Sequence, residues 1–490
     1  MSAGTEDERS VVGAVPDGLF IGGSWQPAAS GAEFPVEDPS LARTLRTVAD
    51  AGAADARAAA DAAASAQEEW AATPPRERSE ILRRAYELLH ARKEELALLM
   101  TLEMGKPLAE ARGEVAYAAE FFRWFAEEAV RIEGGYETSP DGKDRFVVMR
   151  RPVGPVLLIT PWNFPLAMGT RKIGPAVAAG CTMVVKPAEQ TPLSMLALAR
   201  VLTDAGLPAG VLNVLTTSDP GQVVEPLLRD GRIRKLSFTG STQVGRLLLE
   251  QSAEQVLRVS LELGGNAPLL VCQDADLDKA VEGAFAAKMR NMGEACTAAN
   301  RIYAHSSVAQ EFSERLAARM GALRVGRGTE PGVDVGPLID ADGRGKVDEL
   351  VGEALGRGAK ALTGGEHAPG DGYFYAPTVL TGVPADAGML HQEIFGPVAP
   401  VITYEDEDEA VAAANDTEYG LVSYLFTENL ERAFRLSERL ETGMVGLNKG
   451  VVSNPAAPFG GIKHSGLGRE GGRVGIDEFL ETRYLAMPLP

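Results

Sequence analysis

The stretch KLSFTGSTQVG, residues 235–245, places an apolar strand, a glycine turn and the start of a helix in direct succession. Other short apolar runs are also followed by helical segments, namely TMVVK (182–186), GVLNVLT (210–216) and APLLV (267–271). The helices that we expect after these four strands cover 192–205, 221–230, 242–252 and 276–290. Strands that alternate with helices of roughly 10–15 residues are typical of βαβ units and a parallel sheet. The sequence therefore predicts an α/β fold.

The N-terminal part of the chain has a different pattern. Between residues 51 and 131, apolar side chains recur at three- and four-residue steps, which predicts a layer of amphipathic helices. Before this layer we expect short strands over 20–28 and 33–40, and a loose tail over 1–17.

A turn signal interrupts the strands that follow the helical layer. In YETSPDGKDRFVVMRRPVG (136–154), the segment SPDGKD lies between two extended stretches, as in a β-hairpin. A hairpin arm is an unusual excursion unless it packs against another subunit, so we expect a homo-oligomer.

Length, composition and charge narrow the class of protein. The 490 residues suggest two or three domains, and 45% hydrophobic with 24% charged residues is ordinary for a globular protein. A formal net charge of −20 argues against nucleic acid or an anionic membrane as a partner. Three separated cysteines and five isolated histidines predict no metal site. The N-terminus lacks the apolar core of a signal peptide and no apolar run is long enough to span a membrane, so we expect a cytoplasmic protein.

The three cysteines lie in two kinds of setting. Cys181 and Cys272 lie in apolar, strand-like runs, where a cysteine usually packs as a small hydrophobic residue. Cys296 instead lies in FAAKMRNMGEACTAANR (285–301), in a polar turn that contains Gly293. A thiol in such a turn can be reached and ionised. Considered alone, the setting favours an ordinary surface thiol over a nucleophile.

Three further polar residues stand in stretches that favour catalysis. Glu262 interrupts the apolar strand of SLELGGNAP (260–268), and a desolvated glutamate has the raised pKa of a general base. Asn163 stands between two prolines in TPWNFP (160–165), where its amide can donate to an oxyanion or to the local backbone. Glu393 in QEIFGP is another carboxylate beside apolar residues.

Two strand ends have features of a dinucleotide site. Gly240 and Gly245 would let backbone amides approach a phosphate at a helix N-terminus, although a plain structural turn has the same pattern. Lys186 and Glu189 follow a strand in VVKPAEQTP, where a carboxylate can bind ribose hydroxyls. The alternative for this pair is a solvated surface contact.

Seven stretches together resemble the aldehyde dehydrogenase superfamily, in its order and with similar spacing. They are TPWNFP, KPAEQTPLSML, FTGSTQVG, LELGGNAP, NMGEACTAANR, QEIFGP and PFGGIKHSGLGREGG. The resemblance covers nearly the whole chain. It implies a Rossmann-like NAD-binding domain (1–131 and 153–261), a catalytic α/β domain (262–465) and a small β oligomerisation element (132–152 and 466–490), in a homodimer or homotetramer.

The resemblance also implies roles for matching residues. Cys296 would attack the aldehyde, and Asn163 with the Cys296 backbone N–H would hold the oxyanion of the thiohemiacetal. Hydride transfer to the nicotinamide would leave a thioester, and Glu262 would activate the water that hydrolyses it. The cofactor would contact Thr160, Trp162, Lys186, Glu189, Gly240, Ser241, Gly245, Glu393 and Phe395. Because family members that prefer NADP often have a small residue in place of Glu189, we expect NAD, with NADP as a weaker alternative.

Within the superfamily, the closest resemblance is to succinate-semialdehyde dehydrogenases, in RKLSFTGST, KMRNMGEAC, GMVGLNKGVVSNPAAPFGG and SGLGREGG. This resemblance implies that Arg171, Arg290 and Ser453 hold the far carboxylate of the substrate. The alternative substrates are another semialdehyde, such as glutarate semialdehyde, or aldehydes of broad specificity. A structural protein would be expected to have lost Cys296 or Glu262, and a cofactor-free cysteine hydrolase would need a partner base such as histidine.

Two positions depart from the subfamily pattern. Ala298 stands where members often have a second cysteine, so we expect no redox-switch disulfide. Lys449 stands where glutamate is frequent, and a cation there would favour anionic substrates if it lay near the pocket.

Overall fold

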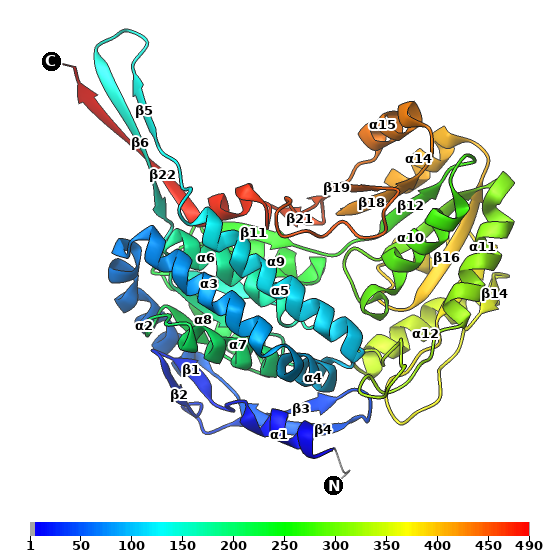
Figure 1. Ribbon diagram of the computed structural model, residues 1–490, viewed down its shortest axis with the longest axis horizontal. Helices are drawn as coiled ribbons and strands as arrows, with labels where there is room; N and C mark the ends of the chain where they lie inside the picture. Colours follow the sequence, from blue (N-terminus) through cyan, green and yellow to red (C-terminus); the bar gives the residue numbers. More distant parts are fainter. Residues whose placement is uncertain (1–4, 490) are drawn as a thin grey trace.

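The structure, a computed structural model, describes residues 5–489. Two α/β halves lie next to each other, and a narrow β arm projects from the half that contains the N-terminal helices (Figure 1). Each half contains one large sheet covered by helices, so the predicted α/β fold class is confirmed.

The first sheet has eight strands in the order β2-β1-β9-β8-β7-β10-β11-β21. Its strands are β1 (Leu19–Ile21), β2 (Ser24–Gln26), β7 (Val156–Ile159), β8 (Met183–Lys186), β9 (Leu212–Val214), β10 (Lys235–Thr239), β11 (Arg258–Glu262) and β21 (Gly466–Leu467). The five central strands are parallel. From β7 the chain proceeds outward through β8 and β9, then returns to the other side of β7 with β10. Ligands of such doubly wound sheets bind where the strand order reverses, at the carboxyl ends of the strands.

Helices cover both faces of this sheet. The predicted helical layer consists of α2 (Ala53–Ala72), α3 (Pro75–Ala91), α4 (Lys93–Met104) and α5 (Leu108–Glu128), and the crossovers contain α6 (Ala167–Ala179), α7 (Pro192–Asp204), α8 (Pro220–Leu228) and α9 (Thr242–Ser252). Helix α9 matches the predicted range, and α7 and α8 match it to within two residues at each end. Strand β3 (Glu33–Asp38) pairs with β4 (Arg43–Ala49) beside these helices.

The prediction of a loose N-terminal tail over residues 1–17 was wrong where the structure describes it. Helix α1 spans Glu6–Ala14 and begins with a reciprocal capping box between Thr5 and Glu8. The Glu8 carboxylate is buried and pairs with Arg327 at 3.0 Å. This partner lies 319 residues away in the chain, so its contribution is invisible in the local sequence. Residues 1–4 of the predicted tail lie outside the described residues.

The second sheet has seven strands in the order β14-β15-β16-β13-β12-β18-β19. Its strands are β12 (Ala267–Val271), β13 (Ala299–His305), β14 (Lys360–Thr363), β15 (Thr378–Thr381), β16 (Val398–Tyr404), β18 (Val422–Phe426) and β19 (Met444–Leu447). The accompanying helices are α10 (Leu277–Met289), α11 (Ser306–Gly321), α12 (Ala341–Gly356), α13 (Gly388–His391), α14 (Glu407–Asn415) and α15 (Leu430–Arg439). Two short strands, β17 (Tyr419–Gly420) and β20 (Ile462–Lys463), pair separately, and 3₁₀ turns occur at Arg290–Gly293 and Arg473–Phe479.

The arm is a three-stranded antiparallel sheet. Strands β5 (Gly135–Thr138) and β6 (Asp144–Pro152) form the predicted hairpin, and β22 (Leu480–Pro488) pairs with the other edge of β6. In Figure 1 these strands extend well beyond the body of the molecule. Residues 466 and 467, which fall in the predicted oligomerisation element, form β21 at the edge of the first sheet. The domain boundaries stay a prediction.

No helix among the described residues is long and apolar enough to cross a membrane.

Candidate active site

A cavity of about 290 Å³ lies at the carboxyl ends of β7, β10 and β11. It collects side chains from both halves of the molecule, including most of the site residues predicted from the sequence. Those that line it are Trp162, Asn163, Arg171, Gly240, Ser241, Glu262, Arg290, Cys296, Glu393, Phe395 and Ser453. The predicted residues Thr160, Lys186, Glu189 and Gly245 are not part of its lining.

A tight backbone reversal brings Cys296 to this cavity. Helix α10 ends before Arg290, and Asn291, Met292 and Gly293 then follow with φ values of 54°, 59° and 81°. A side chain at Gly293 would place its Cβ 2.1 Å from the carbonyl oxygen of Gly396, so only glycine fits there. Left-handed backbone at two residues other than glycine costs free energy and is typical of functional sites.

The Cys296 thiol is held in its protonated form by its surroundings. Burial in the cavity wall raises its pKa to about 12, and the nearby carboxylates of Glu393 and Glu262 act in the same direction. Arg171 and Arg290 lower the pKa of the thiol and oppose this effect. A further positive charge beside the sulfur would therefore favour the thiolate.

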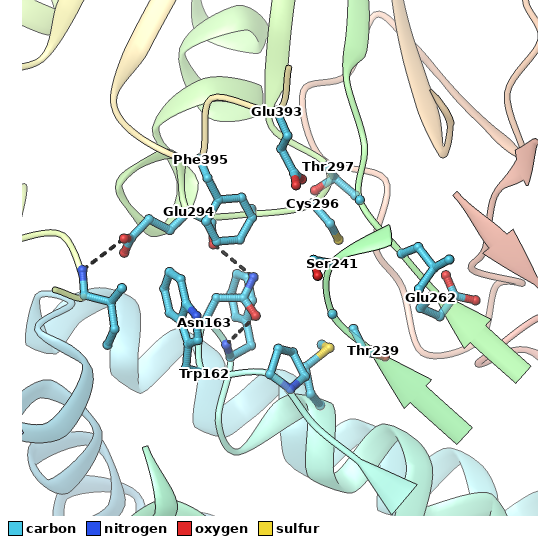
Figure 2. A pocket seen from close by; sticks show the side chains of 18 of the residues that line it. Trp162, Asn163, Thr239, Ser241, Glu262, Glu294, Cys296, Thr297, Glu393 and Phe395 are labelled. Atoms are coloured by element: carbon cyan, nitrogen blue, oxygen red, sulfur yellow. Dashed lines mark hydrogen bonds between the residues drawn. The ribbon is translucent and has the colours of Figure 1, made fainter. Parts of the chain in front are cut away.

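Asn163 is oriented by hydrogen bonds on its side chain and on its backbone. Its Nδ2 donates to the carbonyl oxygen of Glu294 at 3.0 Å, and its Oδ1 accepts from the N–H of Phe164 at 3.1 Å (Figure 2). The Asn163 carbonyl oxygen accepts from Lys106 and Asn291. The amide therefore contacts the backbone, which is one of the two roles that the sequence predicted for Asn163. It still has a second Nδ2 hydrogen for an oxyanion in the cavity.

Glu262 is buried at the end of β11 with 3% of its surface exposed. Neither carboxylate oxygen has a hydrogen-bond partner among the described residues. Burial raises the pKa of Glu262 well above its usual value, and the neighbouring Glu470 raises it further, while Arg171 lowers it. In Figure 2 the carboxylate is directed away from the sulfur of Cys296. A side-chain rotation or a water molecule is therefore needed to connect the two groups.

Two arginines form another wall of the cavity. Arg171 donates from Nη2 to the hydroxyl of Tyr117 at 2.8 Å, and its Nε lies 3.6 Å from a carboxylate oxygen of Glu470. Its guanidinium also stacks on the ring of Phe459, 3.9 Å from the centroid.

Arg290 has a different environment. Its guanidinium lies over the rings of Tyr117 and Phe164, at 5.4 and 5.0 Å. Within residues 5–489 it forms no ion pair with a carboxylate. Its charge is therefore available to a bound anion.

The opposite side of the cavity has the features of a dinucleotide site. Ser241 caps the N-terminus of α9, where its Oγ accepts from the N–H of Val244 at 3.3 Å. A Cβ at Gly240 would lie 2.4 Å from the Phe238 ring, so the backbone passes close to this ring. Gly245 packs on Leu263 within the helix, which explains why it does not line the cavity. The free amides at the start of α9 suit a pyrophosphate.

The remaining cofactor candidates lie at the carboxyl end of β8 and in the cavity wall. Lys186 and Glu189 pair at 3.0 Å, with 5% and 39% of their side chains exposed. The lysine is therefore buried, unlike in a solvated surface pair. In the cavity wall, Glu393 accepts from the N–H of Gly265 at 3.2 Å, and burial raises the pKa of Glu393 to about 7. Phe395 packs edge-on against Trp162, with ring centroids 5.3 Å apart. These residues fit an NAD(P) molecule.

Several cavity and supporting residues were not predicted from the sequence. Tyr117, Phe459 and Lys346 line the cavity, while Lys106 and Asn291 hold the Asn163 backbone. Tyr117 lies among apolar residues with helical spacing, a pattern that predicts an aromatic side chain packed in the hydrophobic core. One local feature of the sequence could have pointed to Lys106. It is a cation beside glycine and proline in MGKP (104–107).

Lys449 is exposed and does not line the cavity, so its predicted influence on the substrate has no structural support. Among the described residues, no group of three or more His, Cys, Asp or Glu side chains is arranged to hold a metal ion.

The chain is similar to known proteins along nearly its whole length. A sequence model described as "Aldehyde dehydrogenase family" matches residues 25–485. A succinate-semialdehyde dehydrogenase of Paenarthrobacter nicotinovorans is 60% identical over 446 residues, which cover 91% of this chain and 99% of that protein. A glutarate-semialdehyde dehydrogenase of Pseudomonas putida is 50% identical over 468 residues, 96% of this chain and 97% of that protein. The crystal structure of an Escherichia coli NADP-dependent enzyme superimposes with a TM-score of 0.96 at 49% identity, covering 97% of this chain and 98% of that one.

Proposed function

Because the chain belongs to the aldehyde dehydrogenase family, we propose that it oxidises succinate semialdehyde to succinate with NAD(P) as hydride acceptor. The observation that carries this proposal is the pair of arginines, Arg171 and Arg290, in the wall of the cavity that also contains Cys296. Arginine binds carboxylates through its planar fork of donors, so an aldehyde with a distant carboxylate fits this arrangement.

The first chemical step belongs to Cys296 and Asn163. The thiol of Cys296 loses its proton to water, and the thiolate sulfur attacks the aldehyde carbon. A carbon–sulfur bond forms as the carbonyl π bond breaks, and the carbonyl oxygen becomes an oxyanion. We assign this oxyanion to the free Nδ2 hydrogen of Asn163 and the backbone N–H of Cys296. Preorganised donors of this kind contribute several kcal/mol to the stabilisation of a transition state, about 3–4 kcal/mol for one donor.

The second step belongs to Glu262. After oxidation the acyl group is a thioester of Cys296, and water must attack its carbonyl carbon. A carboxylate without hydrogen-bond partners and with a raised pKa suits the removal of a proton from this water. Succinate then leaves, and the thiol of Cys296 is regenerated.

The cofactor residues proposed here are the α9 N-terminus with Gly240 and Ser241, the pair Lys186 and Glu189, and Glu393. When bound, the nicotinamide accepts a hydride from the substrate carbon. We propose a preference for NAD, because the Glu189 carboxylate can bind the free ribose diol and repels a 2′-phosphate. The use of NADP by the Escherichia coli relative makes this preference a point to test directly.

The arm supports a homo-oligomer, which we propose as a dimer or tetramer. Tyr136 and Tyr484 on the arm are 67% and 57% exposed, unusual for aromatic side chains on a projecting sheet. A second copy of the chain would cover them. The predicted cytoplasmic location stays a prediction.

A comparison of kcat/KM for succinate semialdehyde and butanal tests the proposed function. The carboxylate is expected to raise kcat/KM by about 100-fold, and Arg290→Ala to remove most of this gain, while the exposed control Arg76→Ala leaves it unchanged. Equal values for the two aldehydes in the unmodified enzyme would refute the anion site. Glutarate semialdehyde belongs in the same series, because the Pseudomonas putida relative favours it as a second candidate and one methylene changes binding by only about 1–3 kcal/mol.

A further inference from the structure

Tyr117 lies between the two arginines of the cavity wall. It belongs to a stripe of α5 formed by Glu110, Glu114, Tyr117 and Phe121, whose spacing places them on one face of the helix. Glu114 is buried in contact with the backbone that follows Asn163. Tyr117 is one turn further along and reaches the cavity itself.

Within residues 5–489, the hydroxyl of Tyr117 accepts a hydrogen bond but donates none. Its oxygen accepts from Nη2 of Arg171 at 2.8 Å. Its own hydrogen has no acceptor among residues 5–489, although a phenol can both donate and accept. A hydroxyl that accepts from a guanidinium is polarised, and so it becomes a stronger donor. Because Tyr117 lines the cavity, its hydroxyl hydrogen is a donor that a ligand in the cavity can use.

The ring of Tyr117 contacts the other arginine. The Arg290 guanidinium lies over it at 5.4 Å from the centroid, and the same ring packs edge-on against Phe121 at 5.0 Å. A phenylalanine at position 117 would preserve both of these ring contacts. The hydroxyl is therefore not needed for packing, and its contacts are with Arg171 and the cavity.

We propose that Tyr117 is a substrate-binding residue whose hydroxyl donates a hydrogen bond to the far carboxylate of the substrate, between Arg171 and Arg290. This inference rests on the proposed function and adds the Tyr117 hydroxyl as a donor to the anion site, beside Arg171, Arg290 and Ser453. One carboxylate oxygen is bound by Tyr117 together with Arg171, and the other faces Arg290. Because Tyr117, Arg171 and Arg290 come from α5, α6 and the turn after α10, the site requires both halves of the fold.

The variant Tyr117→Phe tests the inference. We expect kcat/KM for succinate semialdehyde to fall by about 10- to 100-fold, as for the loss of one hydrogen bond to a charged group. For butanal, which has no carboxylate, we expect a change of less than about two-fold. The matched control is Tyr86→Phe, which removes a hydroxyl on α3 outside the cavity lining.

Inhibition by succinate gives a second readout, which reports the binding of a carboxylate that is not itself oxidised. Succinate should compete with succinate semialdehyde, and its inhibition constant should rise in Tyr117→Phe by the same factor as kcat/KM falls. A melting temperature close to that of the unmodified protein would exclude a folding defect. An equal loss with both aldehydes, or an unchanged inhibition constant, would overturn the role of Tyr117.

The outcomes also separate this inference from the proposed function. If the unmodified enzyme does not prefer succinate semialdehyde to butanal, the proposed function fails and the inference fails with it. If that preference exists and Arg290→Ala removes it, but Tyr117→Phe retains it in full, only the inference about Tyr117 is wrong.

Discussion

Nζ of Lys106 donates a hydrogen bond of 2.8 Å to the backbone carbonyl oxygen of Asn163, and the same ammonium group pairs with Glu114. Both charged side chains are 1% exposed. The other oxygen of Glu114 accepts from the N–H groups of Leu166 and Ala167. One buried ion pair therefore holds the carbonyl of Asn163, the proposed oxyanion donor, and the backbone that follows it.

Replacement of Lys106 is expected to destabilise the protein and impair catalysis. In Lys106→Met, the Glu114 carboxylate stays buried without its cation, which costs about 3–5 kcal/mol in the free energy of unfolding. The double variant Lys106→Met, Glu114→Gln should recover part of this stability, because it removes the unpaired charge, but not kcat. Chemical denaturation and kcat of the active fraction measure the two effects. Full recovery of kcat in the double variant would show that Lys106 does not position Asn163.

Replacement of Glu262 is expected to separate the two halves of the reaction. In Glu262→Gln the acyl-enzyme should still form, giving a burst of reduced cofactor, but steady-state turnover should fall by about 10²- to 10⁴-fold with loss of the general base. Stopped-flow absorbance measures both phases. The exposed control Glu314→Gln should behave as the unmodified enzyme. A burst that disappears together with turnover would instead place Glu262 in the first step.

The reactivity of Cys296 should depend on pH and on the cofactor. Because its pKa is raised to about 12, alkylation by iodoacetamide should be slow at pH 7 and rise about tenfold per pH unit through the accessible alkaline range. NAD has a positively charged nicotinamide, which should lower the thiol pKa and accelerate alkylation at neutral pH if the reagent still has access. The rate is measured by mass spectrometry of the labelled peptide, with Cys296→Ser as control. A plateau below pH 8 without cofactor would contradict the burial effect.

The cofactor preference should depend on Glu189. Glu189→Ser removes the carboxylate that we propose binds the ribose, so kcat/KM with NADP should rise relative to NAD by about 10- to 100-fold. The exposed control Glu77→Ser should leave the ratio unchanged. A ratio that is the same in Glu189→Ser and the unmodified enzyme would mean that another residue sets the choice of cofactor.

Much of the fold was predictable because its signals are local. The strand, glycine turn and helix of residues 235–245 match β10 and α9, and the arm hairpin follows from its turn residues. The seven family-like stretches supported the aldehyde dehydrogenase-like fold, and the family and structural matches confirm it. Helix α1 was missed although Thr5 and Glu8 form a local capping box, and only the pairing of the buried Glu8 with Arg327 depends on a distant residue.

The sequence by itself determined the fold class, the family and the chemical groups that meet in the cavity, among them Cys296, Glu262 and Asn163. Only the tertiary structure decided how these groups are oriented: the carboxylate turned away from the sulfur, the Asn163 backbone held by Lys106, and Tyr117 between two arginines. The reason is physical. Strands, turns and caps depend on neighbouring residues, whereas a hydrogen bond between side chains of different helices exists only after the chain has brought them together.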